Sequence, residues 1–421
     1  MNPVCNVWKN IGFISTRLAG TDGVSLETEK WTKVFEKKCF NCFFMAGELD
    51  RPEESSFLVE EAHFMHPEIK KLTLECFGST VRKSSTTEKI NKLKNHLKKQ
   101  ICKFVKKFEI DVLIPENALA IPVNIPLGMA ITEFIAETGI PTIAHHHDFF
   151  WERKRFLVGC VWDYINMAFP PHLPSIKHVV INSSADNQLS FRTGVSSVVI
   201  PNVMDFDNPP KIESDRDEIR KALGMRNDEI FVLQPTRVIQ RKGIEHAIEL
   251  VSRLGKKAQL VISHASGDEG HVYEKRIAQY SKILNVKTKF ISKIIGDERG
   301  YTKDGRKIYK LSDIYPHADL VTYPSTFEGF GNAFLETLYY KKPIVVNQYS
   351  IYATDIKPKG FKTIEIDEFV SDSTVKETRK ILENPALVKE MTEYNYQLGK
   401  TYYSFNTLEK KLDAILISFA F

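Results

Sequence analysis

The chain has 421 residues, of which 26% are charged, and carries a formal net charge of +5. This length exceeds one ordinary hydrophobic core, and the modest charge gives no indication of nucleic-acid binding. Because the chain has neither an apolar run of about 18 residues nor a basic-then-apolar start, no membrane span or signal peptide is expected, and a cytoplasmic location is predicted.

Short apolar segments alternate with helical stretches along most of the chain, as in a parallel sheet whose strands are joined by helices. The expected strands are residues 11–16, 42–46, 111–115, 141–145, 178–183 and 197–201, then 231–235, 258–263, 288–292, 319–324 and 343–347. This order predicts an α/β protein with two doubly wound domains. Prolines cluster between Pro201 and Pro210, which places the boundary there.

All six cysteines fall in the first 160 residues, an odd placement for a disulfide framework that stabilises the whole chain: Cys5, Cys39, Cys42, Cys76, Cys102 and Cys160. Cys39 and Cys42 form the only C-x2-C pair. A zinc site usually needs a second such pair, and none follows at a suitable spacing. The phenylalanines between and after these two cysteines instead indicate a core strand with reduced thiols.

The basic segment 83–107 predicts an amphipathic helix, because apolar residues recur every three or four positions among lysines. The apolar positions are Ile90, Leu93, Leu97, Ile101 and Val105. Such a helix lies either on an anionic membrane or across a sheet with its lysines in water. Its apolar side lacks tryptophan, which favours the sheet, so membrane contact is not expected.

Three histidines, His145 to His147, lie at the end of the strand expected at 141–145 and directly after it. Side chains on a strand alternate between faces, so only His145 and His147 point the same way. No carboxylate cluster beyond Asp148 is adjacent, and no metal site is expected. His147 is then either a hydrogen-bonded histidine at a strand end or a group that contacts substrate near neutral pH.

Trp151, Arg153 and Arg155 follow the histidines directly. An aromatic ring beside two guanidinium groups suits a sugar or a sugar phosphate acceptor. Residues on the surface of a helix have the same pattern, so both interpretations stay open.

In the second half, residues 230–246 predict a buried strand, a basic turn with Arg237 and Lys242, and a helix opened by Gly243. Cations at the carboxyl end of a parallel strand stand where open α/β sheets bind ligands. They could neutralise a leaving diphosphate without a metal. Residues 296–308 predict an exposed turn or loop extension.

The run from Ser325 to Glu336 has two glutamates, Glu328 and Glu336, eight positions apart around a glycine-rich turn. The turn joins a strand to a helix, so Gly331 lets the backbone approach a ligand at a helix N-terminus. The two carboxylates can touch different ends of one extended ligand, and the layout predicts a sugar-nucleotide site. Taken alone, Glu336 would equally suit a solvated helix face.

Together these motifs resemble the retaining GT-B glycosyltransferases of glycosyltransferase family 4, the group 1 glycosyltransferases. TRVIQRKG is similar to the family's Arg-x4-Lys, and EGFGNAFLE to its E-x7-E. GFISTRLAGTDGVSLETEKW resembles its first strand and glycine loop, PTIAHHHDFFW its strand with a His-Asp pair, and IPNVMDF its connector between domains.

The resemblance implies the GT-B architecture, with two Rossmann-like domains facing a central cleft. The amino-terminal domain, residues 1–205, would bind the acceptor, and the last helix, within 400–421, would pack back on it. Residues 206–399 would bind the nucleotide sugar.

The resemblance also implies donor-side roles. Arg237 and Lys242 would stabilise charge on the leaving diphosphate, Glu328 would hold hydroxyls of the donor sugar, and Glu336 would hold the ribose. The remaining donor contacts would come from the loop glycines Gly20 and Gly23 at the phosphates, the amides of Phe330 and Gly331, and the backbone near Lys293 and Ile294 at the base.

On the acceptor side, the resemblance implies that His147 contacts the donor sugar or orients the acceptor, with Asp148, Trp151 and Arg153 beside it. The expected activity is retaining transfer of a hexose from a UDP-, GDP- or ADP-hexose to a hydroxyl of a small sugar, sugar phosphate or glycerate. No cofactor and no metal are expected. The alternatives are a lipid acceptor at a membrane surface and a non-catalytic sugar-nucleotide-binding protein. The oligomeric state stays open, a homo-oligomer included.

Overall fold

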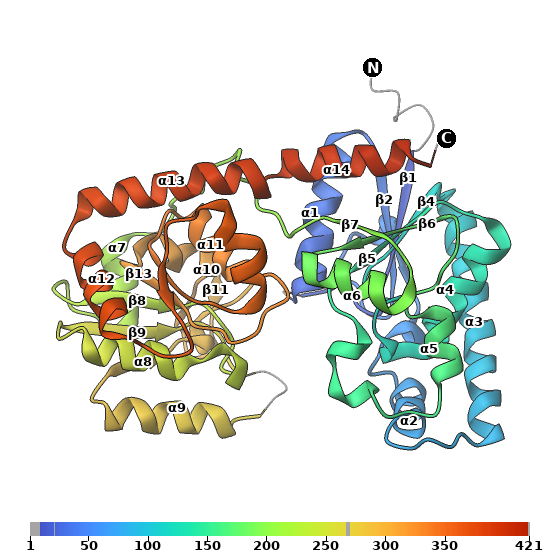
Figure 1. Cartoon of the computed structure of the whole chain (residues 1–421), viewed down its shortest axis with the longest axis horizontal. Helices are drawn as coiled ribbons and strands as arrows, with labels where there is room; N and C mark the ends of the chain where they lie inside the picture. Colours follow the sequence, from blue (N-terminus) through green and yellow to red (C-terminus); the bar gives the residue numbers. More distant parts are fainter. Residues whose placement is uncertain (1–8, 21, 267–269, 420–421) are drawn as a thin grey trace. The chain divides into compact units, whose positions relative to one another are not determined.

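The computed structural model describes residues 9–20, 22–266 and 270–419, and the chain divides into two compact units (Figure 1). Unit 1 consists of residues 1–202 and 405–421, and unit 2 of residues 203–404. The sequence placed the boundary between residues 205 and 206, and the structure places it between 202 and 203. Cys5 lies outside the described residues.

Unit 1 contains a seven-stranded parallel sheet between helices. Its strands are β1 (Asn10–Ile14), β2 (Asn41–Ala46), β3 (Ser56–Leu58), β4 (Val112–Pro115), β5 (Thr142–His146), β6 (Ile176–Val180) and β7 (Ser197–Val199). Its helices are α1 (Gly23–Lys37), α2 (Pro67–Cys76), α3 (Ser84–Phe108), α4 (Ile125–Thr138), α5 (Trp162–Ala168), α6 (Ser183–Thr193) and α14 (Phe405–Ile417).

Unit 2 contains a six-stranded parallel sheet and a small antiparallel hairpin. The sheet strands are β8 (Ile230–Gln234), β9 (Ala258–Ile262), β10 (Lys287–Phe290), β13 (Leu320–Tyr323), β14 (Ile344–Asn347) and β15 (Ile364–Ile366), and the hairpin is β11 (Gly300–Tyr301) with β12 (Lys307–Ile308). The helices are α7 (Arg216–Leu223), α8 (Ile244–Arg253), α9 (Val272–Ile283), α10 (Leu311–Ile314), α11 (Asn332–Tyr339), α12 (Asp372–Leu382) and α13 (Pro385–Tyr403).

The sheets have corresponding strand orders, which determine where ligands can bind. The order is β3-β2-β1-β4-β5-β6-β7 in unit 1 and β10-β9-β8-β13-β14-β15 in unit 2. In both, the chain reverses its direction of travel across the sheet, between β1 and β4 and between β8 and β13. Open α/β sheets bind ligands at the carboxyl ends of the strands at this point. The loops after these strands are therefore the places to look for function.

Each expected strand is present, and the prediction of two doubly wound domains is confirmed. Two strands of the large sheets were missed, β3 and β15, and each forms an edge of its sheet. They are three residues long, with sequences SFL and IEI, too short to show a period. The segment expected as an exposed extension, 296–308, contains the hairpin β11–β12.

Helix α3 packs into unit 1 through its apolar face, as its pattern predicted. Ile90, Leu97 and Ile101 are fully buried in the core beneath it. The Nζ atoms of Lys94 and Lys98 lie 2.6 and 2.7 Å from carboxylate oxygens of Glu133 on α4. Among the described helices of the protein, none is long and apolar enough to span a membrane.

The last helix, α14, belongs to unit 1, although unit 2 precedes it in the sequence. It packs against α1, where Lys38 forms an ion pair with Asp413. Lys411 donates a hydrogen bond to the carbonyl oxygen of Val199 beside β7, 2.8 Å away. The two ends of unit 2 meet each other, because the Met204 N–H donates to the carbonyl oxygen of Tyr403 at 2.8 Å.

Candidate functional site

In unit 2, the basic turn after β8 contacts the loop after β13 through a buried ion pair. Lys242 ends a short 3-10 turn and pairs with the Glu328 carboxylate, which is 7% exposed. Arg241 contacts the other oxygen of the same carboxylate, at 2.9 Å. The structure thus brings Lys242 and Glu328 together, residues that the sequence placed on two separate motifs.

Charges in this cluster do not cancel. Burial lowers the pKa of Lys242, and Glu328 opposes that effect. Burial raises the pKa of Glu328, but Lys242 and Arg241 outweigh it and hold the pKa below its usual value. Arg237 lies on the same loop with an exposed side chain and lowers the pKa of Lys242 further. Two cations pair with the carboxylate and Arg237 lies close enough to act on Lys242, so the group has two positive charges in excess, which suits a diphosphate.

Glycine at position 243 permits the close contact between the two loops. Its φ is +57°, and a Cβ there would lie 2.4 Å from the carbonyl oxygen of Pro324, directly after β13. Only glycine tolerates both the left-handed conformation and this approach. The contact holds the cations of one loop against the glutamate of the other.

The glycine-rich turn before α11 presents unpaired backbone donors. Gly331 precedes the helix with φ of 119°, and a Cβ there would lie 2.7 Å from the Tyr349 hydroxyl. Within the described part of the chain, the N–H groups of Phe330 and Gly331 donate to no other residue. Two free amides at a helix N-terminus can bind phosphate or sugar oxygens.

Glu336 lies on α11 and accepts a hydrogen bond from the Tyr315 hydroxyl, at 2.9 Å. Burial and the Glu336 carboxylate raise the pKa of Tyr315 well above its usual value, so the hydroxyl stays a donor. Both backbone groups of Ile294 are already hydrogen-bonded: its N–H donates to the carbonyl oxygen of Ile291, and its carbonyl oxygen accepts from the Tyr309 N–H, both at 2.9 Å. A base bound near here would therefore contact the adjacent Lys293 more readily.

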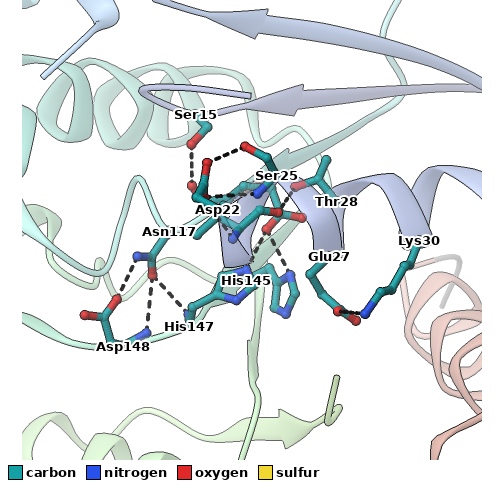
Figure 2. A network of polar contacts seen from close by, with 12 residues as sticks. Ser15, Asp22, Ser25, Glu27, Thr28, Lys30, Asn117, His145, His147 and Asp148 are labelled. Carbon is teal, nitrogen blue, oxygen red and sulfur yellow. Dashed lines mark hydrogen bonds and ion pairs between the residues drawn. The ribbon is translucent and has the colours of Figure 1, made fainter. Parts of the chain in front are cut away.

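In unit 1, the end of β5 forms a polar cluster with the residues that follow β4 (Figure 2). Glu116 is fully buried, and its Oε2 atom lies 2.9 Å from His145 Nδ1 and 3.1 Å from His147 Nε2. Asn117 fixes the chain after the strand, because its side-chain oxygen accepts from the His147 N–H at 3.0 Å. Its amide nitrogen donates to Asp148 at 2.8 Å.

Burial and charge separate the histidines by pKa. Burial lowers the pKa of His145, and Glu116 only partly opposes it. Burial also lowers the pKa of His147, but the Glu116 hydrogen bond outweighs it, so this pKa is raised. Burial raises the pKa of Glu116, and the two imidazoles overcome that and lower it to about 2. The shifts of Glu116 and His147 therefore both favour a carboxylate paired with a protonated His147 ring.

The same three side chains could hold a metal ion. Ligand atoms of Glu116, His145 and His147 lie within 4.8 Å of one another, the one such group among the described residues. From the sequence, only Asp148 was expected as a carboxylate near the histidines, and Glu116 was missed. A protonated imidazole nitrogen cannot bind a metal, so the raised pKa of His147 favours the ion pair. That no metal is needed stays a prediction.

The loop glycines of unit 1 lie beside carboxylates. The Gly20 N–H donates to the Asp50 side chain at 2.7 Å. Gly23 begins α1, and Asp22 caps that helix by accepting from the Val24 N–H at 3.0 Å. Asp50 thus occupies the Gly20 N–H and Asp22 the first amides of α1, and the phosphate contacts of Gly20 and Gly23 stay predictions.

The acceptor-side candidates form internal contacts. Arg153 pairs with Asp148, which Asn117 also holds. Trp151 stacks on Phe149, with ring centroids 4.4 Å apart, and the Arg192 guanidinium lies 5.3 Å from its ring centre. The predicted aromatic platform is thus partly covered, whereas Asp148 directly follows His147 and holds Arg153.

The sequence predicted no role for Glu116 or Asn117, nor for Arg241 as a partner of Glu328. One signal was present for the first two: a polar Glu-Asn pair directly follows the buried strand β4. Polar residues at the carboxyl end of a parallel strand commonly face the ligand edge of the sheet.

Residues 215–398, within unit 2, match the family described as glycosyl transferases group 1. A mannosylglucosylglycerate synthase of Thermotoga maritima is 32% identical over 95% of this chain and 97% of its own length. A protein of the same name from Petrotoga mobilis is 30% identical over 85% of this chain and 86% of its own.

The crystal structure of a glycosyltransferase from Rickettsia africae superposes with a TM-score of 0.71 and 13% identity. That match covers 98% of this chain and 99% of the other. Identity at this level establishes the fold alone, and the fold is GT-B.

Proposed function

This chain belongs to the group 1 glycosyltransferases, and we propose that it moves a hexose from a nucleoside diphosphate sugar to a hydroxyl of a small glycerate-type acceptor. The observation that carries the proposal is the cation cluster at the carboxyl ends of β8 and β13. Arg241 and Lys242 pair with the Glu328 carboxylate, and Arg237 on the same loop brings the excess to two positive charges. A leaving diphosphate supplies the matching negative charge.

The relatives' name supports the proposed acceptor, because it describes a compound of mannose, glucose and glycerate. We propose a glycerate-type sugar as the acceptor and mannose as the first hexose to test. Unit 2 would bind the nucleotide sugar and unit 1 the acceptor.

In the proposed mechanism, the bond between the anomeric carbon and the diphosphate oxygen breaks, and the acceptor oxygen bonds to the same face of that carbon. The acceptor's proton passes to the leaving diphosphate oxygen. Arg237 and Lys242 stabilise the charge that grows on the diphosphate, and the free amides of Phe330 and Gly331 bind donor oxygens. Glu328 holds Lys242 and Arg241 in place besides contacting the sugar.

Stereochemistry tests this mechanism. Because the leaving group acts as the base on its own face, the product should keep the donor's anomeric configuration, as measured by proton NMR of the first product formed. No side chain should become glycosylated in intact-protein mass spectrometry during turnover. EDTA should leave the rate unchanged, because the cations of unit 2 are protein side chains.

An inverted product would contradict the mechanism, since inversion requires a base on the opposite face. Activity that EDTA removes and a divalent cation restores would contradict the metal-free proposal. It would also direct attention to Glu116, His145 and His147.

Calorimetry should show that alanine substitutions of the two glutamates affect nucleotide binding differently. Glu336→Ala should weaken binding of the free nucleoside diphosphate by about tenfold, because the ribose loses a carboxylate partner. Glu328→Ala should spare that affinity, since Lys242 and Arg241 remain to meet the diphosphate, and should act on turnover.

Tyr315→Phe is the matched control for Glu336, because it removes the hydroxyl that donates to this carboxylate and keeps the ring. It should weaken nucleotide binding less than Glu336→Ala does. Weaker nucleotide binding in Glu328→Ala than in Glu336→Ala would mean that the two roles are exchanged.

A further inference from the structure

Glu116 is a buried carboxylate to which neither the motifs nor the proposed mechanism gives a task. Its backbone is fixed from both sides: the Glu116 N–H donates to the Ile14 carbonyl of β1 at 2.8 Å, and its own carbonyl accepts from the Ser15 hydroxyl at 2.9 Å. On the other side it pairs with His145 across an isolated parallel bridge. The carboxylate is therefore held at the switch point of the sheet of unit 1.

The two histidines beside Glu116 differ in their access to a ligand. His145 is fully buried, and its ring stacks on Trp31 with centroids 4.2 Å apart. The His147 side chain is 10% exposed. Its Nε2 atom faces Glu116, whereas its Nδ1 atom hydrogen-bonds to no residue in the described ranges. His147 is thus the member that a substrate can reach.

We infer that Glu116 is a positioning residue, which keeps the His147 ring bound through Nε2–H so that the Nδ1 edge donates a hydrogen bond to a substrate oxygen. The inference rests on the proposed function, because the oxygen belongs either to the donor hexose or to the carboxylate of the acceptor. A neutral ring without Glu116 could carry its proton on either nitrogen. The carboxylate removes that ambiguity.

Charges that face His147 come from several elements. Glu116 follows β4, and Glu27 lies on α1 with Lys30 2.9 Å from it. His145 and Asp148 lie on the same segment as His147, and Arg153 neutralises Asp148. Lys30 and Arg153 pair with two of the three carboxylates, so Glu116 is the anion left for His147. This arrangement directs the Glu116 charge at the His147 ring and favours its doubly protonated form.

Nitrogen-detected NMR of the histidine rings tests the inference directly. In the wild-type protein, His147 should titrate above the ordinary value of about 6.5 and should remain protonated at Nε2 when it becomes neutral. Glu116→Gln keeps the side-chain shape and removes the charge, so the His147 pKa should fall. Glu137→Gln is the control, because Glu137 is an exposed carboxylate on α4 that pairs with Lys98 on α3.

Kinetics then identify the oxygen. If it belongs to the acceptor carboxylate, Glu116→Gln should raise KM about tenfold for the acid and leave KM for its neutral amide unchanged. If it belongs to the hexose, the variant should lower kcat/KM for the donor equally with both acceptors. In either case the basic limb of the pH profile should move to lower pH, because His147 loses its proton earlier.

A wild-type His147 that titrates at or below 6.5, or that carries its neutral proton on Nδ1, would overturn the inference even if no variant folds. Unchanged kinetics in a folded Glu116→Gln protein, or stoichiometric Zn²⁺ binding that this substitution removes, would overturn it as well. If the wild-type protein transfers no hexose to any acceptor, the proposed function fails, but the NMR titration still tests the pairing of Glu116 with His147.

Discussion

Lys242→Ala should lower turnover by about a hundredfold or more, which corresponds to ~2.7 kcal/mol of barrier. The lysine is 8% exposed and lies at the carboxyl end of β8, where charge would grow on the leaving diphosphate. Removing one partner of a buried ion pair usually destabilises a protein, because the other charge is left alone. Glu328 retains Arg241 at 2.9 Å, so the fold should survive.

Steady-state kinetics with saturating donor give the turnover, and circular dichroism checks the fold. Lys257→Ala is the matched control, because Lys257 is an exposed lysine of the same unit that pairs with Asp228. The control should retain full activity. Near-normal turnover in a folded Lys242→Ala protein would remove this residue from the mechanism.

Gly243→Ala should destabilise unit 2 by about 3 kcal/mol or more, because two costs coincide at one position. The φ of +57° is unfavourable for alanine, and the new methyl would lie 2.4 Å from the Pro324 carbonyl oxygen. The clash joins the backbone of one loop to the backbone of the other, so neither a side chain nor a small shift can remove it. The loops after β8 and β13 should move apart, and the contact between Lys242 and Glu328 should loosen with them.

Hydrogen exchange by mass spectrometry measures this effect, since peptides from β8 and β13 should exchange faster in the variant. Gly300→Ala is the control in the same unit, because a Cβ there meets no neighbour and the backbone is not left-handed. All four tryptophans of the chain precede residue 203, so tryptophan fluorescence follows unit 1 separately and should not change. Equal exchange in the Gly243 and Gly300 variants would show that the loop yields without cost.

Most of the fold was predictable because the central strands are buried on both faces and read as continuous apolar runs. The strand β4 is VLIP and β14 is IVVN, and all their residues are buried. The edge strands β3 and β15 were missed because three residues carry too little pattern. The amphipathic period of α3 was enough to predict its packing, since its buried residues recur at helical spacing.

The site was only partly predictable. The sequence placed the cations after β8 and the glutamate after β13 on two separate motifs, and their direct contact depends on the order of these strands in the sheet, which the structure shows. The sequence did not indicate that Glu328 accepts Arg241 as well as Lys242. Glu116 was missed because its partner depends on the register of β4 against β5, which is a long-range property. At Gly20, the sequence did not indicate the hydrogen bond that the backbone N–H donates to Asp50.

The meeting of Met204 with Tyr403 has a practical consequence. Residues 203–404 form one continuous insertion whose entry and exit are adjacent, so we expect that unit 2 can be cut out at two neighbouring points and expressed by itself. The remainder could be rejoined by a short linker and would keep α14. A truncation of residues 405–421, by contrast, would damage unit 1, to which they belong, and would spare unit 2, which precedes them in the sequence.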